Sequence, residues 1–177
     1  FEECCELESL KPLGNAMVDM SFLVVLDLNL SGCSSERQGA QQESFDTIAD
    51  AMATLVHLQV YKLNFSKSPQ LISVDKLGPN ILPSPNIKKV TLDFSDCEEL
   101  CDVDALGIGL GRTNYANLSS LTMNFNRCDK LLSIENIGSA IASMTALERL
   151  SIACQGSPIT MVDGFGRALK ALGGRQK

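Results

Sequence analysis

The sequence lacks the residue patterns on which many activities depend. It has no tryptophan and one histidine, His57, among 177 residues. A single histidine cannot complete a zinc site around the cysteine pair Cys97 and Cys101, so we expect no metal. There is no G-x-S-x-G nucleophile elbow, and we expect the glycine-rich run 107–111 to pack closely within a helix. We therefore expect neither catalysis nor a bound cofactor.

Long hydrophobic runs and an excess of basic charge are also missing. The most apolar stretch, residues 22–30, is interrupted by Asp27 and is shorter than the roughly 20 residues that span a membrane. The formal net charge is −6, which argues against binding to a nucleic-acid backbone. The first ten residues contain four glutamates, where a secretory signal needs a basic start. We expect a cytoplasmic protein that binds neither nucleic acids nor membranes.

What the sequence does contain is a repeated strand pattern. In residues 87–100, Val90, Leu92 and Phe94 alternate with polar residues, a period typical of a strand with one buried face. The frame L-x-x-L-x-L-x-L-x-x-C or a looser copy of it recurs every 29 to 35 residues, which indicates a solenoid. The predicted parallel strands are Leu26–Leu30, Tyr61–Phe65, Val90–Phe94, Leu121–Phe125 and Leu150–Ala153.

A helical pattern follows each strand. Apolar residues spaced three and four apart predict helices along Leu10–Met20, Phe45–Leu55, Val74–Ile81, Val103–Leu110, Ile134–Met144 and Val162–Leu172. Prolines 79, 83 and 85 should shorten the third. One polar residue precedes each of the first five stripes and should accept hydrogen bonds from the first helical turn. These predicted caps are Ser9, Ser44, Ser73, Asp102 and Ser133.

Four of the seven cysteines occupy one position of the repeat: Cys4, Cys33, Cys97 and Cys128. An odd total excludes complete pairing within the chain. Free cysteine commonly serves as a small buried side chain, so we expect these four to be reduced and largely buried. Disulfides are the alternative and would need an oxidising compartment.

A strand, a fixed Cys or Ser and a returning helix, repeated about every 29 residues, resemble the leucine-rich repeat superfamily, and within it the ribonuclease-inhibitor-like and cysteine-containing types. The resemblance implies an α/β solenoid, a right-handed β/α superhelix with short parallel strands on the concave side and helices on the convex side. It would form one domain over residues 1–177, with about five full repeats and a truncated first one. The polar ladder of the family could fall on the cysteine position or on the column of Ser31, Ser66, Ser95 and Asn126.

Proteins of this superfamily typically bind other proteins on the concave strand face, and we expect the same here. The alternative is a purely architectural segment of a larger protein, because the outward columns contain no Trp or Tyr, which favour binding hot spots. The residues expected to contact a partner are Asp27, Asn29, Lys62, Asn64, Lys89, Thr91, Asp93, Thr122, Asn124, Asn126, Arg149 and Ser151.

The two ends of the chain resemble its interior. Phe1 begins inside a repeat, and the last helical stripe is as apolar as the others. Because solenoids need polar terminal repeats to stay soluble, we expect either a piece of a longer array or self-association through uncapped ends.

Overall fold

Strands and helices alternate along the whole of the computed structural model, which describes residues 9–33, 40–81, 84–112 and 117–173. The strands are β1 (Val25–Asn29), β2 (Val60–Asn64), β3 (Lys89–Asp93), β4 (Ser120–Asn124) and β5 (Arg149–Ala153). Each begins one residue before the predicted range. The helices are α1 (Lys11–Val18), α2 (Ala40–Met52), α3 (Leu77–Asn80), α4 (Asp104–Gly111), α5 (Glu135–Ile141) and α6 (Asp163–Gly173).

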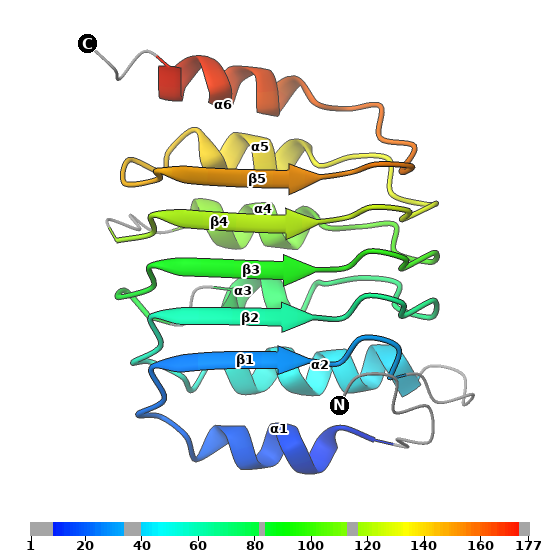
Figure 1. Ribbon diagram of the computed structural model, residues 1–177, viewed down its shortest axis with the longest axis vertical. Helices are drawn as coiled ribbons and strands as arrows, with labels where there is room; N and C mark the ends of the chain where they lie inside the picture. Colours follow the sequence, from blue (N-terminus) through cyan, green and yellow to red (C-terminus); the bar gives the residue numbers. More distant parts are fainter. Residues whose placement is uncertain (1–8, 34–39, 82–83, 113–116, 174–177) are drawn as a thin grey trace.

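The strands form one five-stranded sheet in the order β1-β2-β3-β4-β5, and every neighbouring pair is parallel. The parallel pairing predicted from the repeat is therefore confirmed. Register partners stand at the same position of successive repeats, as in Val25, Val60 and Lys89. The helices lie behind the strands in Figure 1, so they cover one face of the sheet, and no described helix covers the other. We call the uncovered face the open face.

Three of the helices begin as the sequence predicts. The side-chain oxygens of Ser9, Asp102 and Ser133 accept hydrogen bonds from the N–H groups two residues later, where α1, α4 and α5 start. Ser73 makes the same contact with Asp75, just before α3. α3 has only four residues, as the nearby prolines predict.

The prediction for Ser44 is wrong. α2 begins at Ala40, so Ser44 lies inside the helix. Residues 40–43, which precede the predicted helix and its predicted cap, supply the extra first turn.

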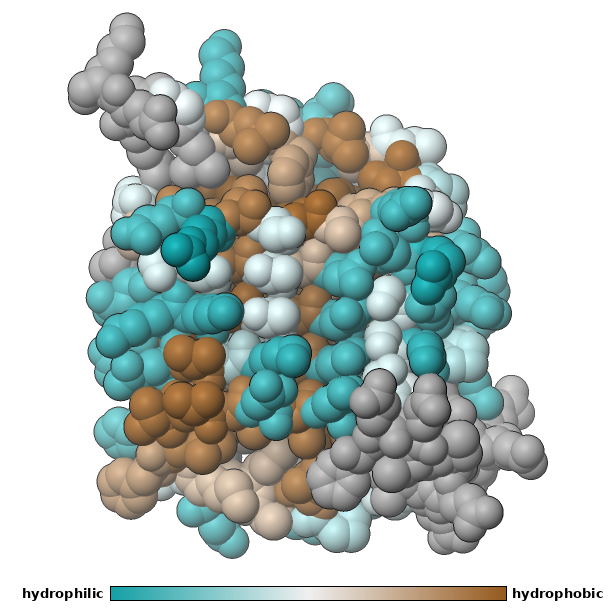
Figure 2. Space-filling model, in the orientation of Figure 1, coloured by the Kyte–Doolittle hydropathy of each residue, from teal (hydrophilic) through white to brown (hydrophobic). Residues whose placement is uncertain are grey.

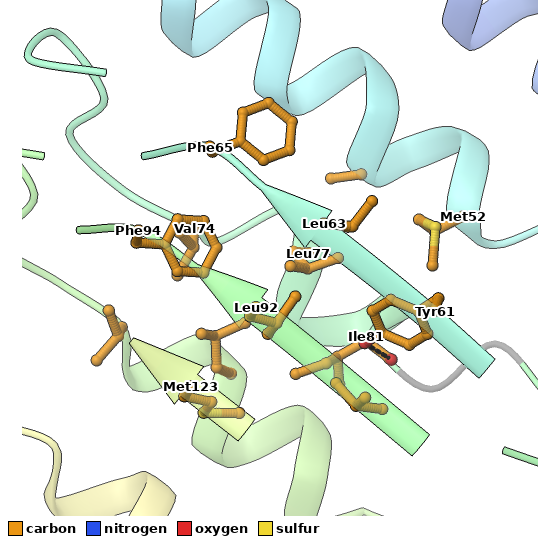
Figure 3. Close-up of a cluster of buried hydrophobic side chains, with 14 of the residues drawn as sticks. Met52, Tyr61, Leu63, Phe65, Val74, Leu77, Ile81, Leu92, Phe94 and Met123 are labelled. Carbon is orange, nitrogen blue, oxygen red and sulfur yellow. Dashed lines mark hydrogen bonds between the residues drawn. The ribbon is translucent and has the colours of Figure 1, made fainter. Parts of the chain in front are cut away.

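The core is a continuous layer between the sheet and the helices. The inward side chains of β2, β3 and β4 are buried, and Figure 3 shows those of Leu63, Leu92 and Met123 among residues of the helices. Phenylalanines at the ends of the strands stack from repeat to repeat, with ring centroids 6.5 Å apart for Phe65 and Phe94 and 5.9 Å for Phe94 and Phe125. Because these rings contact the rings of the neighbouring repeats, the repeats share one core rather than form separate ones.

The cysteine position links successive repeats. The Cys97 thiol donates to the carbonyl of Phe65 at 3.3 Å, and the Cys128 thiol donates to that of Phe94 at 3.2 Å. In the last repeat the Ser157 hydroxyl donates to Phe125 at 2.5 Å and accepts the Cys128 N–H at 2.9 Å. We call this column the ladder. The column of Ser31 and Ser66 also forms a bond between repeats, because the Ser66 hydroxyl donates to that of Ser31 at 2.8 Å.

Burial of the ladder thiols matches the sequence prediction in part. Cys97 and Cys128 are fully buried, and both are free thiols. Burial raises the pKa of Cys97 to about 12 and that of Cys128 to about 11, which keeps them protonated. Cys33 is only half-buried, because it follows β1, which pairs with a strand on one side alone among the described residues. Cys4 lies outside the described residues.

Glycines allow the helices to pack backbone against backbone. A Cβ atom on Gly78, Gly107 or Gly138 would lie 2.2 to 2.4 Å from backbone atoms of the next helix. The close packing expected for the glycine-rich run is therefore confirmed at Gly107, and also at Gly109, whose Cβ would lie 1.8 Å from the Gly78 carbonyl oxygen. In the described ranges, every helix is too short or too polar to cross a membrane.

Candidate partner-binding face

Eleven of the twelve residues expected to contact a partner lie on strands, and Asn126 lies two residues after the end of β4. The central column of the open face is aligned by the sheet register and consists of Asp27, Lys62, Thr91, Thr122 and Ser151. Figure 2 shows pale, weakly polar side chains running up the middle of this face, with more polar ones to either side. Lys62 and Asp27 form an exposed ion pair at 3.8 Å. The remaining side chains of this column are small, so the middle of the face is shallow.

The next column has a structural role as well. The Oδ1 atoms of Asn29, Asn64, Asp93 and Asn124 accept the N–H of the residue two positions later at 2.9 to 3.1 Å. Such side-chain turns end the strands. The chain then passes through a left-handed residue in each repeat. These residues are Gly32, Lys67, Asp96, Arg127 and Gly156. Contact of this column with a partner stays a prediction, but the side-chain Oδ1 atoms already accept these hydrogen bonds.

Charged side chains beyond the turns pair with one another. Arg127 donates to both carboxylate oxygens of Asp96 from the next repeat. The hydrogen bond from Arg127 lowers the pKa of Asp96 below its usual range. Asn126 accepts the Gln155 N–H at 2.6 Å. These side chains therefore hold neighbouring repeats together at the carboxyl ends of the strands.

The amino ends of the strands carry a feature that the sequence interpretation missed. Phe22 is 83% exposed, and Val24, Val25 and Val56 are exposed beside it. Phe22 stacks on His57 with ring centroids 5.5 Å apart and planes 5° apart. We call these four apolar residues the apolar patch; Figure 2 shows it as the brown area at the lower left. Exposed apolar surface gathered in one place often marks an interaction site.

A signal for this patch was present in the sequence. Val24 and Val25 occupy the positions that later repeats fill with Lys88 and Lys89, or with Glu148 and Arg149. Apolar residues at positions that are polar in the last three repeats indicate a function specific to this end of the sheet. The alternating strand pattern predicts which positions are buried and does not identify exposed apolar residues.

A lysine pair borders the apolar patch. Lys88 and Lys89 are both exposed, and neither forms an ion pair with any residue that the structure describes. By register, Lys89 lies two strands from Val25, with Val60 between them. Backbone hydrogen bonds connect Val24, Gln59 and Lys88 in the same order. The amino ends of the strands thus change from apolar at β1 to basic at β3.

The far end of the sheet has an apolar cavity of about 380 Å³ between β5 and α6. It is lined mainly by Ile134, Ile152, Val162, Phe165 and Leu169. The inward residues of β5 are only half-buried, whereas their equivalents in β3 and β4 are fully buried. Among the residues that the structure describes, β5 pairs with a strand on one side alone, as β1 does.

The side chains on these surfaces are suited to binding through direct contacts. In the described ranges, no three His, Cys, Asp or Glu side chains gather where they could hold a metal ion. His57 uses its ring face on Phe22. That the chain is not an enzyme and takes no cofactor stays a prediction.

No protein-family model, curated protein or solved structure matches the chain. Its function is therefore inferred from its own residues.

Proposed function

We propose that the chain is a leucine-rich-repeat solenoid that binds a protein partner on the open face of its sheet. The observation that carries the proposal is the exposed apolar patch beside a sheet face that no described helix covers. Binding surfaces combine apolar anchors with a polar surround, and the aligned columns from Asp27 to Ser151 supply the polar part.

The solenoid assignment is supported by the strict repetition of contacts. Every strand pairs with the one a repeat earlier, in unshifted register. The ladder at Cys97, Cys128 and Ser157 repeats the same bond to the preceding strand. In such arrays each repeat contacts only its neighbours.

Removal of one repeat tests the solenoid. Deleting residues 90–120 joins Lys89 to Leu121, the register partner of Val90. We expect a cooperatively folded protein with one strand fewer, because the new neighbours keep matching register and core positions. Collapse of the variant into an unfolded chain, by circular dichroism and denaturant titration, would count against independent repeats.

Partner binding is tested with a matched pair of substitutions. Thr122→Arg places a long charged side chain in the centre of the open face, and Ile108→Arg places the same side chain on the exposed surface of α4. Proteins captured from a lysate of cells that express the chain should be lost with Thr122→Arg and kept with Ile108→Arg. Equal capture by both variants would favour the architectural alternative.

We also propose that the protein works in the cytoplasm. Buried free thiols at Cys97 and Cys128 suit a reducing compartment. Mass analysis of the native protein without reductant should find both as thiols, and a disulfide at either would contradict this location.

A second candidate function, an architectural part of a longer array, is supported by the cavity between β5 and α6. In the inner repeats a further strand fills the equivalent space. Sedimentation of the isolated chain at tens of micromolar distinguishes the cases. Self-association through uncapped ends predicts species larger than the 19.1 kDa monomer, and a stable monomer would argue against open ends.

A further inference from the structure

We propose that the open face takes a linear, acidic segment of its partner that carries an apolar anchor residue. The anchor packs on the apolar patch, and its carboxylates bind the lysine pair. This inference rests on the proposed function and names the class of ligand for that site.

The apolar half of the site is prepared for an anchor. Phe22 is held by its stack on His57, so its ring is presented in a fixed orientation and not as a free side chain. Val25 is 58% exposed on the sheet itself. Two rigid apolar side chains from different elements lose little entropy when a third packs against them.

The basic half is free to bind. The ammonium groups of Lys88 and Lys89 have no carboxylate partner in the part of the chain that the structure describes. Two carboxylates lie on this face, those of Asp27 and Asp93, and Glu148 directly precedes β5. Asp27 is paired with Lys62 at 3.8 Å, and Asp93 accepts hydrogen bonds from the N–H and the hydroxyl of Ser95 at 2.9 and 2.7 Å. The lysine pair is thus where an incoming negative charge meets least competition.

The spacing of the two halves defines the ligand. Neighbouring strands are about 4.8 Å apart, so Val25 and Lys89, two strands apart, are about 10 Å from each other. A peptide in the polyproline II conformation advances about 3.1 Å per residue and completes one turn in three residues, so side chains three apart point the same way. A peptide that crosses the strands in this conformation therefore needs an apolar residue followed three residues later by Asp or Glu.

An anionic membrane is the other surface that apolar and basic residues could meet. The net charge of −6 disfavours it, because the whole molecule is repelled while only two lysines are attracted. A short segment avoids this repulsion, since it contacts the lysine pair alone and distant charges are screened beyond about 8 Å at physiological salt.

Selection from a displayed library of random 12-residue peptides tests the proposal with the intact chain as bait. We expect selected peptides to be enriched in an apolar residue with Asp or Glu three positions away. Their affinity should fall at least tenfold with Lys88→Glu plus Lys89→Glu and with Val25→Asp, and stay unchanged with Ile108→Arg. A peptide with its acidic residues replaced by lysine should regain affinity for the doubly charge-reversed variant.

The other possible outcomes distinguish failure of this inference from failure of the proposed function. Peptides that are lost with Thr122→Arg but ignore the charge reversal would overturn the acidic class and leave the open face as the binding site. Peptides that ignore every open-face substitution would overturn both. A library that gives no binder would overturn the linear segment, whereas partner capture would still report on the face. Binding to vesicles of phosphatidylserine and phosphatidylcholine that the Lys88→Glu plus Lys89→Glu variant loses would overturn the peptide in favour of a membrane.

Discussion

The middle of the sheet and its first strand are built on the same repeat but expose very different surfaces. In β3 and β4 the inward residues are fully buried, and the outward ones are polar, such as Thr91 and Thr122. In β1 the inward Leu26 is half-buried and the outward Val25 is exposed. The difference comes from neighbours: β1 pairs with a strand on one side alone, within the described residues. It shows that the repeat supplies stability in the middle, whereas distinctive surface chemistry lies at the edge.

Removing one aromatic ring from each region should give the largest difference in the free energy of unfolding. Phe94 is fully buried between the rings of Phe45, Phe65 and Phe125. Phe94→Ala should lower the free energy of unfolding by about 3–5 kcal/mol. Phe22→Ala should change it by less than about 0.5 kcal/mol, because that ring is largely in water. Urea titration measures both, and similar losses would mean that the edge is as tightly packed as the middle.

Replacing a helix glycine by alanine should give a smaller difference in stability between a tightly packed and an open position. In Gly107→Ala the new Cβ meets the backbone of Asn136 at 2.2 Å, so α4 and α5 must move apart. We expect a loss of about 1–3 kcal/mol, the usual cost of overpacking.

Gly166→Ala is the matched control for that substitution. Nothing lies within 4 Å of the new Cβ, and alanine favours the helix by up to about 1 kcal/mol. The temperature of thermal unfolding should therefore fall for Gly107→Ala and rise for Gly166→Ala. A stabilising Gly107→Ala would contradict backbone-to-backbone packing.

Ionisation of the ladder thiols should have the smallest effect on stability, and only at high pH. The pKa of Cys97 is raised from 9.0 to about 12 by burial, so above pH 9 the unfolded chain releases a proton that the folded chain keeps. Stability should therefore fall as the pH rises from 9 towards 12.

Cys97→Ser isolates this contribution, since serine fills the same ladder position at Ser157 and does not titrate in this range. Comparison of the two proteins by urea titration at pH 7 and pH 10 should show a steeper loss for the natural chain. Equal pH dependence would mean that the thiol is not protected by burial.

The sequence predicts the sheet and most of the helices because the apolar positions recur in fixed register. It also places Cys97 and Cys128 in the core. It does not predict where α2 begins, because a polar segment such as that before Glu43 suits a loop or an exposed first turn equally well. The apolar patch escapes prediction for a different reason: the alternation that places Leu28 in the core places Val25 at an outward position, where its apolar side chain is exposed.

Mapping of the contact surface by backbone amide chemical shifts tests the central claim most directly. The ¹⁵N-labelled chain would be titrated with a peptide from the library selection, or with the captured partner. We predict that shifts concentrate in β1, β2 and β3, including Val25, Val60 and Lys89, with none at Ile108 on α4. Shifts confined to the helices, with the strands unchanged, would contradict partner binding on the open face.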